Sequence, residues 1–128
     1  MTPLPSDPLR IFISCGETSG DIHAAELLRS LRKYKPELSC DAMTGPALLA
    51  AGATRLHGIE ELSVMGGTEI LSAIPRALRM LTDIRRRLES ARPAAIILVD
   101  APEFNFRVAA MAHKLRIPVY YYISPKIW

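Results

Sequence analysis

The chain has 128 residues, the length of one domain. Hydrophobic residues make up 49% and charged residues 23%, which excludes a disordered, collagen-like or low-complexity chain. The net charge of +3 is uneven, because residues 75–92 hold six arginines against only Asp83 and Glu89. This pattern indicates one basic surface and not the widespread positive charge of a nucleic-acid-binding protein. No aromatic residue lies among these arginines to stack on a base.

The first residues contain three prolines and no apolar core, so they are not a signal peptide. We expect residues 1–9 to be a disordered lead-in and residues 10–128 to form one domain in the cytoplasm. The longest uncharged stretch, residues 42–54, is shorter than the roughly 20 apolar residues of a membrane span. Cys15 and Cys40 lie in apolar runs without a metal-ligand spacing, which predicts buried free thiols.

Strands and helices are predicted to alternate along the chain. Apolar and β-branched runs predict strands over residues 10–15, 38–43, 54–59, 94–99 and 119–123. Helical spacing and stop signals predict helices over residues 22–34, from Pro46 to Gly52, and over residues 103–115. A turn at residues 64–67 precedes a long helical pattern that reaches about Ala91, and Pro75 is expected to divide that pattern into two helices.

This alternation predicts a Rossmann-like, doubly wound parallel sheet with helices on both faces and strand order 3-2-1-4-5. Ligands of such sheets bind beyond the carboxyl ends of the strands, at the switch point, which here lies between the first and fourth strands. The loops Gly16–Asp21 and Asp100–Asn105 should therefore lie side by side. The chain ends at Trp128 without a helix to cover its last strand, so we expect a truncated product or a fragment of a longer protein.

The first of these loops, GETSGD, is neither a dinucleotide-binding fingerprint nor a Walker A sequence. Glu17 and Asp21 place two negative charges near a helix N-terminus, so a phosphate would have to compete with them for that position. Carboxylates are better suited to binding the hydroxyl groups of a sugar. The alternative is that Ser19 or Asp21 caps the helix and the glycines set the turn. Both interpretations can hold together.

In the second loop, Asp100 follows a buried strand, and a partly desolvated carboxylate suits a general base. The alternative is a capping box formed with Glu103, with Pro102 in the first helical turn. Asn105 either hydrogen-bonds a ligand or faces solvent one turn further along.

The long helical pattern separates apolar from basic side chains. The simplest interpretation is a solvated face opposite a packed one. Contact with an anionic membrane surface, helped by Leu71, Ile74 and Met80, and binding of a phosphorylated ligand are the alternatives. The predicted apolar face holds Ile70, Ile74, Leu78, Leu81, Ile84 and Leu88, and the basic face holds Arg76, Arg79, Arg86 and Arg87.

The remaining candidate residues are expected to pack. His23, His57 and His113 share no metal-ligand spacing, and Tyr120–Tyr122 point alternately to the two faces of a strand.

Five segments together resemble the amino-terminal part of lipid-A-disaccharide synthase, a family of GT-B glycosyltransferases with two Rossmann-like domains. The resemblance covers residues 11–128. The segments, in order, are GETSGD, ELSVMGGTEIL, the PRALRML…IRRR helix, VDAPEFN and YYYISPKIW.

The resemblance implies a role in making the lipid A of Gram-negative lipopolysaccharide. It implies transfer of 2,3-diacylglucosamine from a UDP donor to the 6-hydroxyl of 2,3-diacylglucosamine 1-phosphate, forming a β-1',6 linkage and releasing UDP, with inversion and without a metal or other cofactor. Asp100 matches the candidate base. The resemblance further implies that the glycine-containing loop beside it binds substrate, with Gly16, Glu17, Ser19, Gly20 and Asp21.

The resemblance also implies a peripheral position on the inner face of the cytoplasmic membrane, because both substrates are lipids with acidic head groups. The segment that follows Val64-Met65-Gly66 matches the family's membrane-facing apolar region. We expect lipid or membrane contacts from Met65, Leu71, Ile74, Arg76, Arg79, Met80, Arg86 and Arg87.

The family's UDP-binding carboxyl-terminal domain has no counterpart in these 128 residues, so the chain alone is expected to be inactive and to carry the acceptor half of a site. Two alternatives remain open at this point. One is a nucleotide-binding Rossmann domain of another enzyme, which the missing glycine-rich fingerprint disfavours. The other is a non-catalytic module that binds anionic lipid through the arginine-rich helix.

Overall fold

The structure is a computed structural model that describes residues 9–63, 70–100 and 102–122. Residues 1–8 of the expected lead-in over residues 1–9, and the turn expected at residues 64–67, lie outside these ranges along with the rest of residues 64–69. The strands are β1 (Arg10–Cys15), β2 (Ser39–Thr44), β3 (Thr54–Gly58), β4 (Ala95–Val99) and β5 (Val119–Tyr122). The helices are α1 (Thr18–Tyr34), α2 (Pro46–Ala50), α3 (Glu60–Ser63), α4 (Ile70–Ala91) and α5 (Pro102–Lys114).

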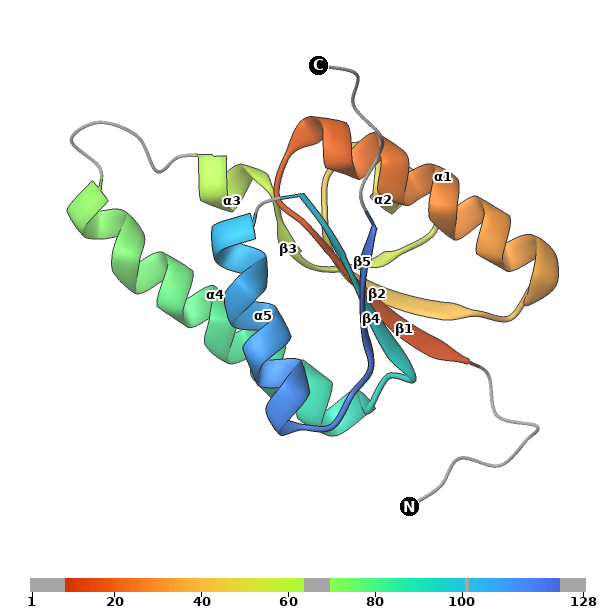
Figure 1. Cartoon of the computed structure of the whole chain (residues 1–128). Coiled ribbons are helices and arrows are strands. Elements are labelled where there is room, and N and C mark those ends of the chain that lie inside the picture. Colours follow the sequence, from red (N-terminus) through yellow and green to blue (C-terminus); the bar gives the residue numbers. More distant parts are fainter. Residues whose placement is uncertain (1–8, 64–69, 101, 123–128) are drawn as a thin grey trace.

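The five strands form one parallel sheet in the order β3-β2-β1-β4-β5, which confirms the predicted topology. Helices α1 and α2 cover one face of the sheet, and α4 and α5 cover the other (Figure 1). β1 and β4 pair along their whole length, from Ile11 opposite Ala95 to Cys15 opposite Val99. The loops that leave these two strands therefore start side by side.

The core has two parts because β1 and β4 bury side chains on both faces, as parallel strands between two helical layers must. Along β1, Ile11 and Ile13 point toward α1 and α2, whereas Phe12 points toward α4 and α5. Along β4, Ile97 and Ile96 divide in the same way. The uninterrupted apolar runs in the sequence follow from this two-sided burial.

Helix α1 begins at Thr18, four residues earlier than predicted, so most of the GETSGD segment belongs to its first turn. Its buried residues include Asp21, Ala24 and Leu28, whereas Ile22, the first residue of the predicted helix, is 50% exposed. The face turned toward the sheet thus includes a carboxylate, which an apolar-periodicity argument cannot find.

Pro75 does not divide the long pattern, since α4 is a single helix with this proline inside it. Pro75 lies in the second turn, where the missing N–H removes only one intrahelical hydrogen bond. Packing of Met80, Ile84 and Leu88 against the sheet holds the rest of the helix. A separate short helix, α3, precedes α4.

Both cysteines are buried and free, as predicted. Burial raises the pKa of the Cys15 thiol to about 12, helped by the negative charge of Asp21. Burial likewise raises the pKa of Cys40 to about 12, although the Arg32 charge opposes the rise. Because the thiolate is the reactive form, neither side chain is a nucleophile near neutral pH.

We predict that neither thiol reacts with an aromatic disulfide reagent at about pH 8 in the native chain, because the thiolate is both scarce and enclosed. Both should react at once in concentrated guanidinium chloride. The absorbance of the released thiolate measures the two rates. Fast labelling of the native chain at either cysteine would contradict the burial described here.

Candidate functional site

The loops that follow β1 and β4 meet at Gly20 and Asp100. A β-carbon at Gly20 would lie 2.7 Å from Oδ2 of Asp100 and 3.2 Å from Cγ1 of Val99. Only glycine lets the first turn of α1 come this close to the carboxylate. The predicted meeting of these two loops at the switch point is therefore seen in the structure, and Asp100, which is partly exposed, stands at its centre.

Asp100 has a left-handed backbone, with φ of 55°. This conformation costs about 1–2 kcal/mol for a residue with a β-carbon, and aspartate tolerates it better than most. A residue that caps a helix N-terminus has an extended backbone instead, and α5 begins only at Pro102. The backbone of Asp100 thus does not fit the capping-box alternative.

Asn105 is fully buried, so neither expectation for it is correct: it faces no solvent, and its amide is used inside the protein. Nδ2 donates to the backbone oxygens of Asp100 (2.7 Å), Ser14 (3.1 Å) and Val99 (3.4 Å). Oδ1 accepts from the hydroxyl of Ser14 at 2.7 Å. The amide thereby ties the end of β4 to β1 and to the first turn of α5.

Tyr121 adds a second donor to the same place, since its hydroxyl donates to the backbone oxygen of Asp100 at 3.0 Å. Burial raises the pKa of Tyr121, and the negative charge of Asp100 raises it further, so the phenol remains a donor near neutral pH. Tyr121 was assigned to packing from the sequence. The register that pairs Leu98 with Tyr121 places the ring near the end of β4, and this register comes from the structure and not from the sequence.

Asp21 does not face a ligand, which corrects its predicted substrate role. It is 1% exposed, and its carboxylate accepts from the backbone N–H groups of Gly45 (3.1 Å), Ala47 (2.8 Å) and Leu48 (2.8 Å). The prediction that Asp21 caps its own helix is therefore wrong, since its carboxylate caps the start of α2.

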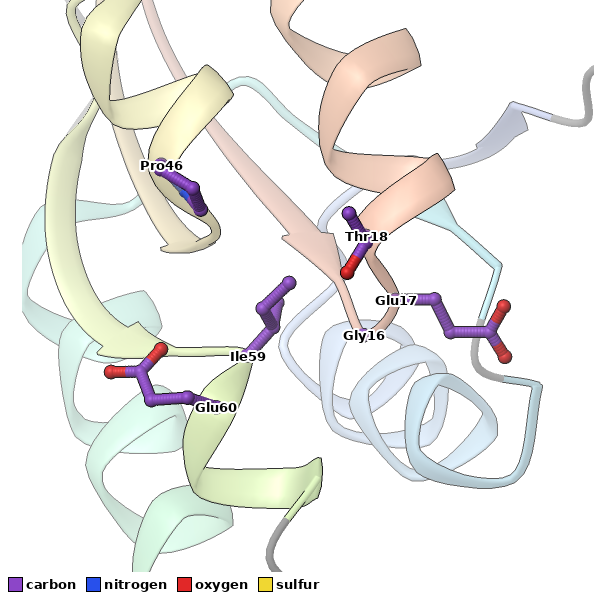
Figure 2. Close-up of a pocket in the computed structure, with 6 residues that line it drawn as sticks. All are labelled: Gly16, Glu17, Thr18, Pro46, Ile59 and Glu60. Atoms are coloured by element: carbon purple, nitrogen blue, oxygen red, sulfur yellow. The ribbon is translucent and has the colours of Figure 1, made fainter.

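The other residues of the first loop remain accessible. Glu17 occupies the N-cap position of α1 without a side-chain capping bond, and both Glu17 and Ser19 are exposed. An open pocket of about 440 Å³ lies beside this loop, on the side of β2 and β3. In Figure 2, Ile59 points into it, whereas the carboxylates of Glu17 and Glu60 point away. The pocket is lined by Gly16, Glu17, Thr18, Pro46, Ile59 and Glu60.

Helix α4 differs between its two halves. Near its start, Ile74 and Leu78 are 54% and 55% exposed although the sequence placed them on the packed face, whereas Met80, predicted to contact lipid, is buried in the core. The predicted packed face is thus confirmed at Leu81, Ile84 and Leu88 and is wrong at Ile74 and Leu78. Met65 and the side chain of Leu71 lie outside the described part of the structure.

The predicted basic residues of α4 are all exposed. Arg76, Arg79 and Arg86 lie on the surface, and Arg87 forms an ion pair with Asp41 of β2, with Nε and Oδ2 2.8 Å apart. The side chain of Arg87 is therefore partly used in joining α4 to β2. Among the helices in the described ranges, none is both long enough and apolar enough to cross a bilayer.

His57 links three elements through two carboxylates. Its Nδ1 lies 3.0 Å from Oε2 of Glu61 on α3, and its Nε2 lies 2.9 Å from Oδ2 of Asp83 on α4. Burial would raise the pKa of Glu61, but hydrogen bonds from the Gly58 N–H and His57, with the charges of His57 and Arg55, outweigh it and lower that pKa. This cluster attaches α4 to the edge of the sheet.

The sequence matches one described protein family over almost its whole length. A family model described as lipid-A-disaccharide synthetase matches residues 11–128. The chain belongs to this family. A lipid-A-disaccharide synthase from Myxococcus xanthus is 45% identical over 123 residues, covering 96% of this chain and 32% of the relative. One from Anaeromyxobacter dehalogenans is 46% identical over 119 residues, covering 93% and 31%.

The fold is also found in solved structures of low sequence identity to this chain. The MurG structure from Acinetobacter baumannii superimposes with a TM-score of 0.62 at 12% identity, over 91% of this chain and 35% of MurG. This likeness shows the shared fold alone, a parallel sheet with helices on both faces. The chain spans about a third of the length of the curated relatives it matches.

We predict that Asp21→Ala lowers the free energy of unfolding by roughly 3 kcal/mol, because three buried N–H groups lose a charged acceptor. Urea denaturation followed by circular dichroism measures the change. Glu26→Ala, which removes an exposed carboxylate from the same helix, is the control and should be nearly neutral. Equal stability of the two variants would contradict the capping role.

Proposed function

We propose that this chain supplies the acceptor side of a lipid-A-disaccharide synthase. In this reaction a 2,3-diacylglucosamine unit passes from UDP to the 6-hydroxyl of 2,3-diacylglucosamine 1-phosphate. Family membership supports the reaction class. The observation that carries the assignment of roles is the partly exposed carboxylate of Asp100, in a left-handed backbone at the switch point. Outlying backbone angles of this kind cluster at functional sites.

Asp100 is the general base in this proposal. Its carboxylate removes the proton of the acceptor 6-hydroxyl as that oxygen bonds to the anomeric carbon of the donor. The bond from the anomeric carbon to the UDP oxygen breaks on the opposite face, and UDP leaves with the electron pair. Attack opposite the leaving group inverts the configuration. The UDP-binding groups come from the part of the relatives that lies beyond this chain, so the chain alone is inactive.

Glu17 and Ser19 are exposed side chains of the first loop, and we assign them to the acceptor's hydroxyl groups. A negative side chain at a helix N-terminus disfavours a phosphate there. The acceptor's phosphate is therefore expected to lie away from Glu17. Gly16 and Gly20 act through their backbone, by setting the loop and by making room for Asp100.

We predict that Asp100→Asn lowers kcat by about 10²- to 10⁴-fold with little change in the KM for the acceptor, since the amide cannot accept the proton. A chimera that joins this chain to the carboxyl-terminal two thirds of the Myxococcus xanthus relative is the protein to use. Release of UDP and formation of the disaccharide are measured together.

Glu103→Gln is the matched control, because it neutralises an exposed carboxylate in the first turn of α5. It should retain turnover. Near-normal turnover of the Asp100→Asn chimera would exclude Asp100 as the base.

We further propose that α4 contacts anionic lipids at the inner face of the cytoplasmic membrane. Arg76 and Arg79 are exposed on the same half of the helix as the exposed apolar side chains of Ile74 and Leu78. Apolar groups flanked by arginines are the composition that binds an anionic interface. Arg86 lies further along the helix, and Arg87 is held by Asp41.

We predict that the double variant Arg76→Ala/Arg79→Ala binds phosphatidylglycerol vesicles roughly 30-fold more weakly, because each arginine contributes about 1 kcal/mol near such a surface. Vesicle co-sedimentation measures the affinity. Arg29→Ala/Lys33→Ala removes the same charge from α1, on the other side of the sheet, and should have a small effect. Equal losses in both double variants would mean that only net charge matters.

A further inference from the structure

The backbone oxygen of Asp100 accepts two hydrogen bonds from side chains on different elements. One comes from Nδ2 of Asn105 on α5, at 2.7 Å, and the other from the hydroxyl of Tyr121 on β5, at 3.0 Å. Both donors bind the residue whose φ is 55°. The two bonds therefore hold in place a conformation that the residue does not favour by itself.

The Asn105 donor is itself fixed. Its Oδ1 accepts from the Ser14 hydroxyl, and its Nδ2 also reaches the Ser14 and Val99 oxygens. A flipped amide would place oxygen against carbonyl oxygens, so only one orientation satisfies all the partners. Both Ser14 and Asn105 are fully buried. This half of the arrangement is rigid and belongs to the core.

The Tyr121 donor differs because the residue is 39% exposed at the edge of the sheet. Its ring is not part of either core cluster, whereas Tyr122 packs against the cluster under α1 and α2. The hydroxyl of Tyr121 can thus be removed without creating a cavity in the core. A hydroxyl that binds the backbone of one exposed carboxylate residue is suited to orienting that residue.

We propose that Tyr121 and the Ser14–Asn105 pair are positioning residues that hold the left-handed backbone of Asp100 and so direct its carboxylate across Gly20 toward the acceptor hydroxyl. This inference rests on the proposed function for the identity of the acceptor. The orienting role itself concerns only this chain. A base held in a single orientation needs no reorganisation at the moment of proton transfer.

The first test uses this chain and does not depend on activity. Tyr121→Phe removes the hydroxyl and keeps the ring, and Tyr120→Phe, on the neighbouring and more exposed tyrosine, is the matched control. We expect the ¹⁵N order parameter of the Asp100 amide to fall from about 0.85 toward about 0.6 in Tyr121→Phe alone. The melting temperatures of both variants should stay close to that of the unaltered chain. An unchanged order parameter in Tyr121→Phe would overturn the proposal.

The second test uses the chimera described above. Tyr121→Phe should lower kcat about tenfold without changing the acceptor KM, because a misdirected base slows proton transfer and leaves binding intact. In the Asp100→Asn background the same change should have no further effect, since the positioned group is already gone. Equal effects in the two backgrounds would overturn the role of Tyr121. An inactive unaltered chimera would count against the proposed function and leave the first test to decide the orienting role.

Discussion

The parallel pairing of β1 with β4 is the constraint on which the rest of the structure depends. These central strands bury side chains on both faces, so one helical layer must cover each face. The connection from β1 leads to α1 on one face, and the connection from β4 leads to α5 on the other (Figure 1). The two connections separate where the strands end, and Gly20 and Asp100 meet there. The site is thus a consequence of how the core is closed.

Several polar residues of the recognisable segments serve this geometry. Asp21 holds the start of α2 against α1, and Asn105 holds the end of β4 against β1. Both are buried and form their hydrogen bonds inside the protein, so their removal acts first on structure. Among the polar side chains at this site, Glu17 is exposed and Asp100 is partly exposed, and these are the ones proposed to meet the substrate. A segment by which the family is recognised therefore contains residues that hold a loop in shape as well as residues whose side chains remain accessible at that loop.

Helix α4 combines two surfaces along one axis. Its later part packs on the sheet through Ile84 and Leu88, and the His57 cluster fixes it to β3. Its earlier part exposes Ile74 and Leu78 beside arginines. Pro75 is tolerated because the helix is held by the core further along and does not depend on every intrahelical bond. One helix can thus be anchored at one end and present an apolar and basic surface at the other.

The amino-acid sequence was enough to predict the strand order, the two helical layers and the meeting of the two loops, because apolar periodicity and right-handed crossovers leave few arrangements of five strands. The family was predicted from the resemblance of five segments. The sequence also predicted Asp100 as the candidate base, and the structure places this residue where the two loops meet. Only the tertiary structure decided that Asp21 caps α2, that Asn105 is buried, that Met80 faces the core and that Tyr121 binds the backbone of Asp100. These roles depend on partners up to 91 residues away, as between Ser14 and Asn105. The local sequence shows which residues are polar. The packing of elements that are distant in the sequence decides which of these polar side chains stay accessible to a substrate.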